Sequence, residues 1–581
     1  MLGKFLLKLS TVMLLTFAAA CSPAPDKGED GGDAVSPVYD VIIRGGTIYD
    51  GLGGAPYVGD VAITGDRIAA LGDLGGARAT AEIDATGKAV SPGFINMLSW
   101  ATESLIEDGR GMSDIKQGVT LEVMGEGWSM GPLNEKMKTD QLARQGDIKF
   151  AIKWTTLGEY LDHIVARGIS PNVASYVGAT TIRIHELGRD DIDPTPEQLA
   201  RMQELVREAM REGALGVGSS LIYAPAFYAE TPEIVALVSA AAEFDGAYIS
   251  HVRSEAIKLE EAIAELIAIA RETGAPAEIY HLKASGKSNW HKLENVFAMV
   301  EAARAEGLRI TANMYTYPAS ATGLSAAMPL WVQEGGHEKW MARLAEPQVR
   351  ARLVREMHEP SEDWNNRFLE VGPDGILLLS FKNPALKPLT GKTLQQVADE
   401  RGMDAAEVAI DLILEDDSRV GVSYFSMSED NVKKKVAQPW VSFGSDEEAA
   451  ATGGVFLLSN NHPRAFGTFV RVLGKYSRDE GVIPLEEAIR KLTSLPAHNI
   501  GIRDRGRLAA GYYADIVVFD PATVSDHATF PKPHQYATGV EHVFVNGGHV
   551  LKDGVHTGAL PGRVVRGPGW TGWAGQETAT D

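Results

Sequence analysis

The sequence predicts an α/β protein with three parts: a (β/α)8 barrel of the TIM type, a small β-sandwich built from both termini, and an insertion before the last barrel strand. Three observations predict this fold. Eight short apolar segments alternate with amphipathic stretches through the centre, both ends share short strands separated by Gly and Asp turns, and one long segment interrupts the alternation. The 581 residues are enough for one large domain and a smaller one.

Residues 1–21 predict a signal peptide. "MLGKFLLKLSTVMLLTFAAAC" carries two lysines, then an apolar run, then three alanines before Cys21, the only cysteine of the chain. This pattern indicates an exported, periplasmic lipoprotein that a lipid on Cys21 anchors to a membrane. The alternative is a chance cysteine at an ordinary cleavage site. Residues 22–37, rich in Gly, Asp and Pro, are expected to form a flexible linker.

The composition argues against several kinds of partner. Apolar residues make up 44% of the chain and charged residues 23%, which is typical of a globular protein. The formal net charge of −22 argues against nucleic acid and against anionic membrane surfaces. The lipid anchor is therefore the only membrane contact that we expect.

Residues 38–90 and 506–566 are expected to form the β-sandwich together. "YDVIIRGGTIYDG" and "GDVAITGDRIAALG" near the start alternate short apolar runs with turn residues. "ADIVVFDPATV" and "VEHVFVNGGHVLKDG" repeat this pattern near the end. Two β-rich ends around a long centre indicate one small domain to which both ends contribute.

Residues 91–505 are expected to form the barrel. The strand candidates lie at 93–98, 119–125, 172–178, 214–221, 247–252, 277–282, 309–317 and 440–446. Eight strands that alternate with helices favour a closed parallel barrel over an open doubly wound sheet. One helix is expected to begin after Thr195, with Pro196 in its first position and Gln198 completing a capping box. Residues 321–402 break the rhythm and are expected to be the insertion.

Ionisable side chains stand where four of these strands end, and in such a barrel that edge carries the functional site. They are Glu126, His251, His281 and Asp446. A lone histidine there is more often a structural residue, and Asp446 could belong to a simple Asx turn. Two histidines on adjacent strands, with two acids also placed, favour a zinc site with three protein ligands. Asp446 could then be the base for water on that metal.

Longer motifs carry a family resemblance. "HPRAFGTFVRVLGKYSRDEGVIPLEEAIRKLTSL" and "GRLAAGYYADIVVFDPATVSDHATF" are close to the C-terminal signature of the N-acyl-D-amino-acid deacylases (D-aminoacylases) of the amidohydrolase superfamily. "SPGFIN", "GVTLEV", "HVRSEA", "YHLKASG", "MYTYPAS" and "FGSDEE" match in the same order. The chain thus resembles this family over nearly all of residues 38–566.

The resemblance implies a metal-dependent barrel that hydrolyses the N-acyl bond of a D-amino acid. It implies that His251 and His281 belong to the tighter metal site and that Asp446 is the catalytic acid and base. It also implies that Lys283, Tyr223 and Tyr315 hold the free carboxylate of a small substrate, and Arg253 stands where a second cation could help.

The chain departs from the family pattern at two places. Leu98 and Trp100 replace the family's His-x-His, and we expect Trp100 to fill that space with apolar bulk. In "GEGWSMGP", Glu126 stands where the family's "GNCGxSxAP" carries a cysteine ligand. We therefore expect one Zn²⁺ per chain, held by Glu126, His251 and His281.

Two alternative functions remain open from the sequence. An amidohydrolase of the same fold could act on another amide, such as a D-amino-acid dipeptide or a cyclic imide. A lipoprotein that binds ligands and has lost catalysis is the second alternative, which the loss of His-x-His favours a little.

Overall fold

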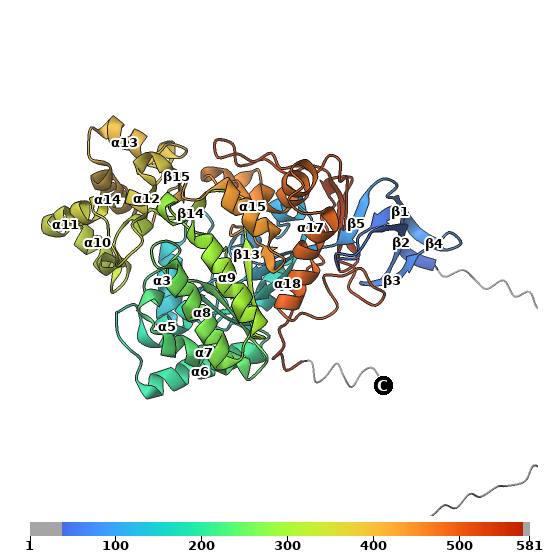
Figure 1. Ribbon diagram of the computed structural model, residues 1–581, viewed down its shortest axis with the longest axis horizontal. Coiled ribbons are helices and arrows are strands. Elements are labelled where there is room, and N and C mark those ends of the chain that lie inside the picture. Colours follow the sequence, from blue (N-terminus) through green and yellow to red (C-terminus); the bar gives the residue numbers. More distant parts are fainter. Residues whose placement is uncertain (1–37, 573–581) are drawn as a thin grey trace, which may run out of the picture. The chain divides into compact units, whose positions relative to one another are not determined.

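The computed structural model describes residues 38–572 (Figure 1). The expected signal peptide, Cys21 and the expected linker lie outside the described residues. Within residues 38–572, no helix is both long enough and apolar enough to span a membrane.

The predicted parallel barrel is confirmed. All eight predicted strands are present: β6 (Phe94–Asn96), β7 (Val119–Met124), β8 (Asn172–Ser175) with β9 (Val177–Gly178), β10 (Gly216–Ser220), β11 (Ala247–His251), β12 (Ala277–Ile279), β13 (Ile310–Met314) and β17 (Val441–Phe443). β6, β7 and β8 pair in parallel, and so do β9 to β13 and β17. β8 and β9 form one strand interrupted at Tyr176. Met97 N donates to Phe443 O at 3.1 Å, which joins the last strand to the first.

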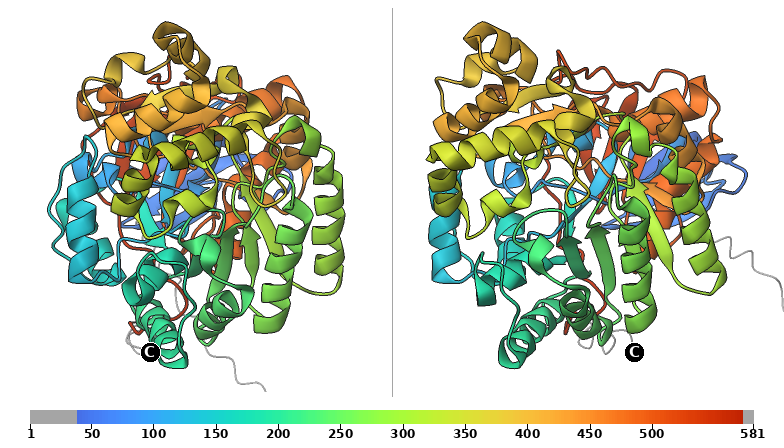
Figure 2. Two further views of the ribbon diagram at one scale, coloured as in Figure 1. Left: turned by 90° about the vertical axis from the view of Figure 1, so that its left-hand side faces the viewer. Right: turned by 60° about the vertical axis from the view of Figure 1, so that its left-hand side comes forward.

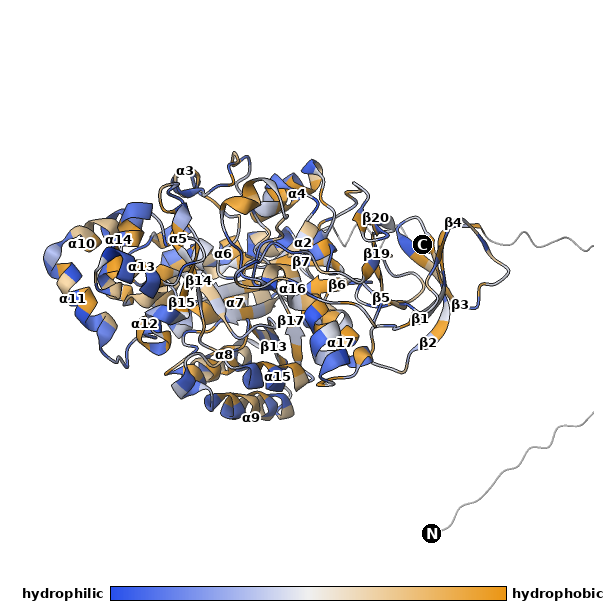
Figure 3. Cartoon of the chain, turned by 90° about the horizontal axis from the view of Figure 1, so that it is seen from above, coloured by the Kyte–Doolittle hydropathy of each residue, from blue (hydrophilic) through white to orange (hydrophobic). Residues whose placement is uncertain are grey.

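Helices cover the barrel, and most of them are amphipathic and bury one apolar face against the strands. They include α4 (Leu157–Arg167), α5 (Ala179–Leu187), α6 (Pro196–Arg211), α7 (Thr231–Ala242), α8 (Leu259–Thr273), α9 (Lys292–Ala305), α15 (Glu429–Ala437), α16 (Arg464–Arg471), α17 (Leu485–Leu492) and α18 (Ser494–Asn499). Of these helices, α5 and α16 are buried along nearly their whole length. Hydrophobic and hydrophilic residues alternate along α8 and α9 in Figure 3. The expected capping box of α6 is present, since Thr195 and Gln198 exchange side-chain and backbone hydrogen bonds.

Both ends of the chain build one nine-stranded sheet. Its strands are β1 (Val38–Ile48), β2 (Tyr57–Thr64), β3 (Arg67–Gly72), β4 (Arg78–Asp84), β5 (Ala89–Pro92), β18 (Ile516–Phe519), β19 (Val540–Val545), β20 (Gly548–Lys552) and β21 (Val555–His556). The antiparallel pair of β5 and β18 joins the two ends. β4 and β5 pair with different halves of β1, so the sheet divides there. Figures 1 and 3 show β1–β4 on the side of the barrel opposite the insertion.

The insertion has its own sheet and its own core. β14 (Ser320–Gly323), β16 (Gly421–Tyr424) and β15 (Ile376–Ser380) pair in that order, with α10 (His337–Ala345), α11 (Pro347–His358), α12 (Arg367–Val371), α13 (Leu394–Arg401) and α14 (Ala405–Asp416) around them (Figure 2). It continues to Tyr424, beyond the expected end near Gly402. The reason is that α14 packs its apolar face into the core of the insertion instead of against the barrel.

Candidate metal centre

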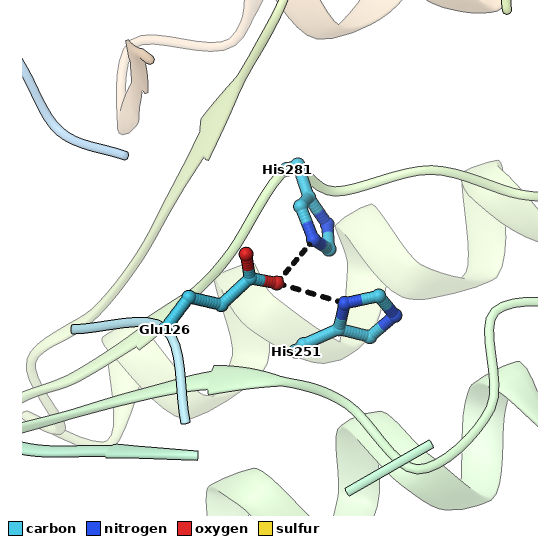
Figure 4. Close-up of side chains that lie close together, drawn as sticks. All are labelled: Glu126, His251 and His281. Carbon is cyan, nitrogen blue, oxygen red and sulfur yellow. Dashed lines mark hydrogen bonds and ion pairs between the residues drawn. The ribbon is translucent and has the colours of Figure 1, made fainter. Parts of the chain in front are cut away.

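Three side chains from three strand ends, two of them on the adjacent strands β11 and β12, converge at the mouth of the barrel. Glu126 follows β7, His251 ends β11 and His281 follows β12. His251 Nδ1 lies 2.9 Å and His281 Nε2 2.8 Å from Glu126 Oε1, and all three side chains are buried (Figure 4). These three residues are called the ligand cluster below.

The local backbone explains how Glu126 reaches this position. Gly125 and Gly127 flank it with φ of 106° and 68°, in the region that favours glycine. A Cβ on Gly127 would lie 2.5 Å from Ser220 Oγ, and one on Gly125 would lie 2.4 Å from a backbone oxygen of Tyr176. The two glycines therefore let the loop pass close enough to β9 and β10 for the carboxylate to face the histidines.

His281 and Asp446 adopt strained backbone conformations. Their φ values are 33° and 54°, in the left-handed region that residues other than glycine rarely adopt. His281 N donates to Asn313 Oδ1 at 2.8 Å, and Asp446 N donates to Leu98 O at 2.8 Å. Strain that neighbouring strands maintain in this way is typical of functional sites.

The ligand cluster fits a metal ion. The donor atoms of its two imidazoles and its carboxylate all lie within 4.8 Å of one another. Two imidazoles and a carboxylate are a ligand set that zinc uses in catalytic sites. Burial acts to raise the pKa of Glu126, but the charges and hydrogen bonds of His281 and His251 lower it below its ordinary value. The carboxylate is therefore ionised, as a metal ligand must be.

Trp100 does more than fill space, so that expectation needs correction. Its indole Nε1 donates to Glu126 Oε2 at 3.1 Å and to Asp446 Oδ1 at 3.2 Å. Leu98, in contrast, is 1% exposed and packs into an apolar core. Trp100 stands where the family's His-x-His has its second histidine, and its indole N–H links Glu126 of the ligand cluster to Asp446.

Asp446 follows β17 and lies between two donors. Arg464 Nη1 lies 2.7 Å from Asp446 Oδ2, and Arg464 Nη2 donates to the backbone oxygen of Asp446 at 2.6 Å. Burial raises the pKa of Asp446, and the positive charge of Arg464 opposes that shift without cancelling it. A carboxyl group with a raised pKa can exchange a proton nearer to neutral pH than an ordinary aspartate.

Lys283 lies on the side of the His281 ring that faces away from Glu126. Its Nζ is 2.7 Å from His281 Nδ1 and forms an ion pair with Glu255. The side chain is only 3% exposed, and burial lowers its pKa despite the nearby carboxylate. The ammonium group predicted to hold a substrate carboxylate therefore already has a partner within the protein.

Of the other residues expected to bind substrate, Tyr223 and Tyr315 lie beside the histidines and Arg253 lies apart from them. The Tyr223 ring packs edge-on against His251, with centroids 5.1 Å apart. Tyr315 Oη is buried and makes no hydrogen bond within residues 38–572, while the Lys283 ammonium lies 5.6 Å from its ring centroid. Arg253 uses its donors on Glu265 and on two backbone oxygens. The structure thus brings both tyrosines and Lys283 to the histidines and gives Arg253 a separate ion pair.

A cavity of about 550 Å³ lies beyond the ligand cluster, separated from it by Tyr223 and Arg367, and Arg253 also lines it. The barrel side, helix α8 and the insertion line it together. Tyr223 belongs both to its wall and to the surroundings of His251. Its wall combines apolar side chains with many polar ones, among them the charged residues Arg253, Arg367 and Glu265.

Sequence reasoning missed three buried charged residues at this site. Glu255 stands inside the quoted "HVRSEA", four residues after His251, and Arg464 stands inside the quoted "HPRAFG". Their motifs could have revealed both. Arg367 comes from the insertion, and no motif indicates that this segment returns to the histidines.

Comparison with known proteins places these observations in a family. Residues 81–551 match the amidohydrolase family. The chain is 33% identical to the D-aminoacylase of Alcaligenes xylosoxydans xylosoxydans over 534 residues, which is 91% of this chain and 98% of that protein.

Two solved structures resemble the whole fold. One is a D-aminoacylase whose binuclear metal centre was described in terms of one-metal activation and second-metal attenuation; it has 33% identity and a TM-score of 0.75, and the match covers 91% of this chain and all of that one. The other is the N-acyl-D-glutamate deacylase of Bordetella bronchiseptica, complexed with zinc and a phosphonate that mimics the tetrahedral intermediate. It has 31% identity, the same TM-score and the same coverage. The chain belongs to the amidohydrolase family and, within it, to the D-aminoacylases.

Proposed function

We propose that this protein hydrolyses the amide bond of N-acyl-D-amino acids with one zinc ion held by Glu126, His251 and His281. The observation that carries the proposal is the convergence of this ligand cluster with Asp446, to which Trp100 joins it by hydrogen bonds. The similarity to D-aminoacylase over nearly the whole of both chains supports this substrate class.

When bound, zinc would lower the pKa of a water molecule and polarise the amide carbonyl. Asp446 takes a proton from the attacking water and delivers it to the amide nitrogen as the C–N bond breaks. Its raised pKa suits both transfers. Arg464 and Trp100 hold the two carboxylate oxygens in place, so the proton is exchanged at a fixed position.

The surroundings of the ligand cluster support a substrate with a free carboxylate. Lys283, Tyr315 and Arg464 place two cations and a phenol near His281 and Asp446. Tyr315 Oη has no hydrogen-bond partner among residues 38–572 and is available to a substrate carboxylate, whereas Lys283 would bind it in exchange for its ion pair with Glu255. The cavity beyond the ligand cluster would accommodate the parts of the substrate that lie farther from the amide.

A screen of the zinc-loaded protein with N-acetyl-D-amino acids and their L-forms tests this function. We expect release of acetate from at least one D-form and none from the L-forms, and release slowed roughly a hundredfold or more in Asp446→Asn. Each substrate is also offered as its methyl amide. If the methyl amide is hydrolysed as fast as the acid, the carboxylate is not recognised and an amidohydrolase of another amide, such as a cyclic imide, becomes the better assignment.

We also propose that the mature protein is a periplasmic lipoprotein anchored through Cys21. The support is the order of a charged start, an apolar run and three alanines directly before the single cysteine.

A further inference from the structure

Glu255 is a buried acid that the proposed mechanism does not use. Its side chain is 2% exposed, and its two oxygens have different partners. Oε1 lies 3.3 Å from His251 Nε2 and 3.3 Å from His281 Nδ1, and it also forms the ion pair with Lys283. Oε2 accepts a hydrogen bond from Arg367 Nη2 at 2.9 Å.

The two histidines divide their nitrogens between two carboxylates. His251 Nδ1 and His281 Nε2 face Glu126, while the opposite nitrogen of each ring faces Glu255. His251 Nε2 is buried and makes no hydrogen bond within residues 38–572. Because a buried N–H without an acceptor is unfavourable, a ring that binds metal through Nδ1 is expected to donate from Nε2 to Glu255.

Lys283 competes with Glu255 for His281 Nδ1. The ammonium can only donate a hydrogen bond, so it suits a ring whose Nδ1 has no proton. A neutral imidazole that binds metal through Nε2 carries its proton on Nδ1 and needs an acceptor there. Glu255 can supply this acceptor and Lys283 cannot.

Arg367 connects the insertion to this carboxylate. It is the first residue of α12 and is 3% exposed. Its Nη1 also reaches Ser285 Oγ at 3.5 Å, and its guanidinium lies 5.7 Å from the ring centroid of Tyr424. This buried cation pairs with Glu255 at 2.9 Å and so helps to fix the carboxylate that contacts both histidines.

We propose that Glu255 is a positioning residue. It orients both metal-binding histidines through the ring nitrogens that face away from Glu126, His251 Nε2 and His281 Nδ1. Arg367 holds Glu255 in place, so the insertion contributes to metal affinity. The inference rests on the proposed function in taking the ligand cluster as the metal site. It does not depend on which substrate is hydrolysed.

Metal binding by the full-length protein tests this proposal. Zn²⁺ affinity is measured by competition with a chromogenic chelator, and Co²⁺ is titrated while its visible absorption is recorded. We expect Glu255→Gln to weaken Zn²⁺ binding roughly 10–100-fold and to alter the Co²⁺ spectrum. We expect Arg367→Met to weaken binding roughly tenfold and Arg367→Lys, which keeps the cation, to restore most of it. Arg350→Met is the matched control and is expected to bind Zn²⁺ as tightly as the unaltered protein, because Arg350 forms its ion pairs with Glu407 and Asp411 inside the insertion.

The outcomes separate this proposal from the proposed function. If Glu255→Gln and Arg367→Met bind both metals as tightly as the unaltered protein, with the same Co²⁺ spectrum, the positioning role is refuted while the metal site stands. If the unaltered protein binds neither metal, the proposed function fails and this inference fails with it. Should Glu255→Gln not fold, as judged by circular dichroism, the comparison of Arg367→Met with Arg367→Lys decides.

Discussion

Replacing Trp100 with phenylalanine would remove one N–H from between two buried carboxylates and keep most of the apolar ring. The indole nitrogen lies 3.1 Å from Glu126 Oε2 and 3.2 Å from Asp446 Oδ1. A hydrogen bond to a charged group contributes about 1.5–3 kcal/mol. Because one N–H is shared between two acceptors, we expect the lower part of that range, which corresponds to a roughly ten- to thirtyfold fall in kcat/KM.

The assay is the steady-state hydrolysis of the best N-acetyl-D-amino acid by zinc-loaded protein, with metal content measured on the same sample. Trp331→Phe is the matched control. Trp331 Nε1 also donates to a carboxylate, Glu356 Oε2 at 2.9 Å, but it does so within the insertion. We expect Trp331→Phe to have the same kcat/KM as the unaltered protein. That result would show that losing a tryptophan N–H elsewhere in the protein does not lower kcat/KM.

One result would refute the reasoning about Trp100. If Trp100→Phe has the same kcat/KM and the same metal content as the unaltered protein, its N–H does not help to hold Glu126 or Asp446. Trp100 would then only fill the space of the missing histidine, as the sequence alone suggests.

Four further predictions concern the metal, Asp446, Glu122 and Cys21. Elemental analysis is expected to give one tightly held zinc per chain and none in His281→Ala, and two tightly held metals would contradict this. Asp446→Asn is expected to keep the metal and lose hydrolysis roughly a hundredfold or more; near-normal turnover would mean that another group moves the proton. Burial raises the pKa of Glu122 from 4.5 to about 7, because the folded protein favours its neutral form. The contribution of this neutral form to the free energy of unfolding is therefore complete below pH 4.5 and is lost as the pH rises through 7. In urea unfolding, Glu122→Gln should therefore remove a pH-dependent loss of unfolding free energy on the order of 3 kcal/mol, whereas Glu107→Gln, at an exposed position, should not. Cys21→Ser is expected to release the protein from the membrane fraction or to stall its processing, and an unaltered protein that is already soluble with another N-terminus would contradict the lipoprotein proposal.

The barrel could be predicted from the sequence because its strands are short apolar runs, and side-chain type changes sharply where each strand ends. Glu126, His251, His281 and Asp446 stand at those ends, and parallel strands bring such ends to one edge of the sheet. Local pattern therefore carried both the fold and the position of the candidate site.

The contacts between these residues could not be predicted in the same way. The hydrogen bond from Trp100 to Asp446 joins residues 346 positions apart, and its geometry depends on how one side chain crosses the barrel mouth. Arg367 reaches Glu255 only because the insertion folds back over the barrel. Neither arrangement leaves a periodic or motif signal in the sequence.

The sheet shared by both ends has a consequence for the order of folding. β5 leads directly into the first barrel strand, yet its partner β18 lies near the other end of the described chain, and Gly93 N donates to Asp515 O at 2.8 Å beside this pair. Pairings between such distant segments form slowly, because the intervening chain must first be brought together. During synthesis, β5 can pair with β1 early, but its other edge stays unpaired until β18 has emerged from the ribosome. A fragment that ends after the barrel would keep every residue of the ligand cluster and still leave one edge of β5 without β18.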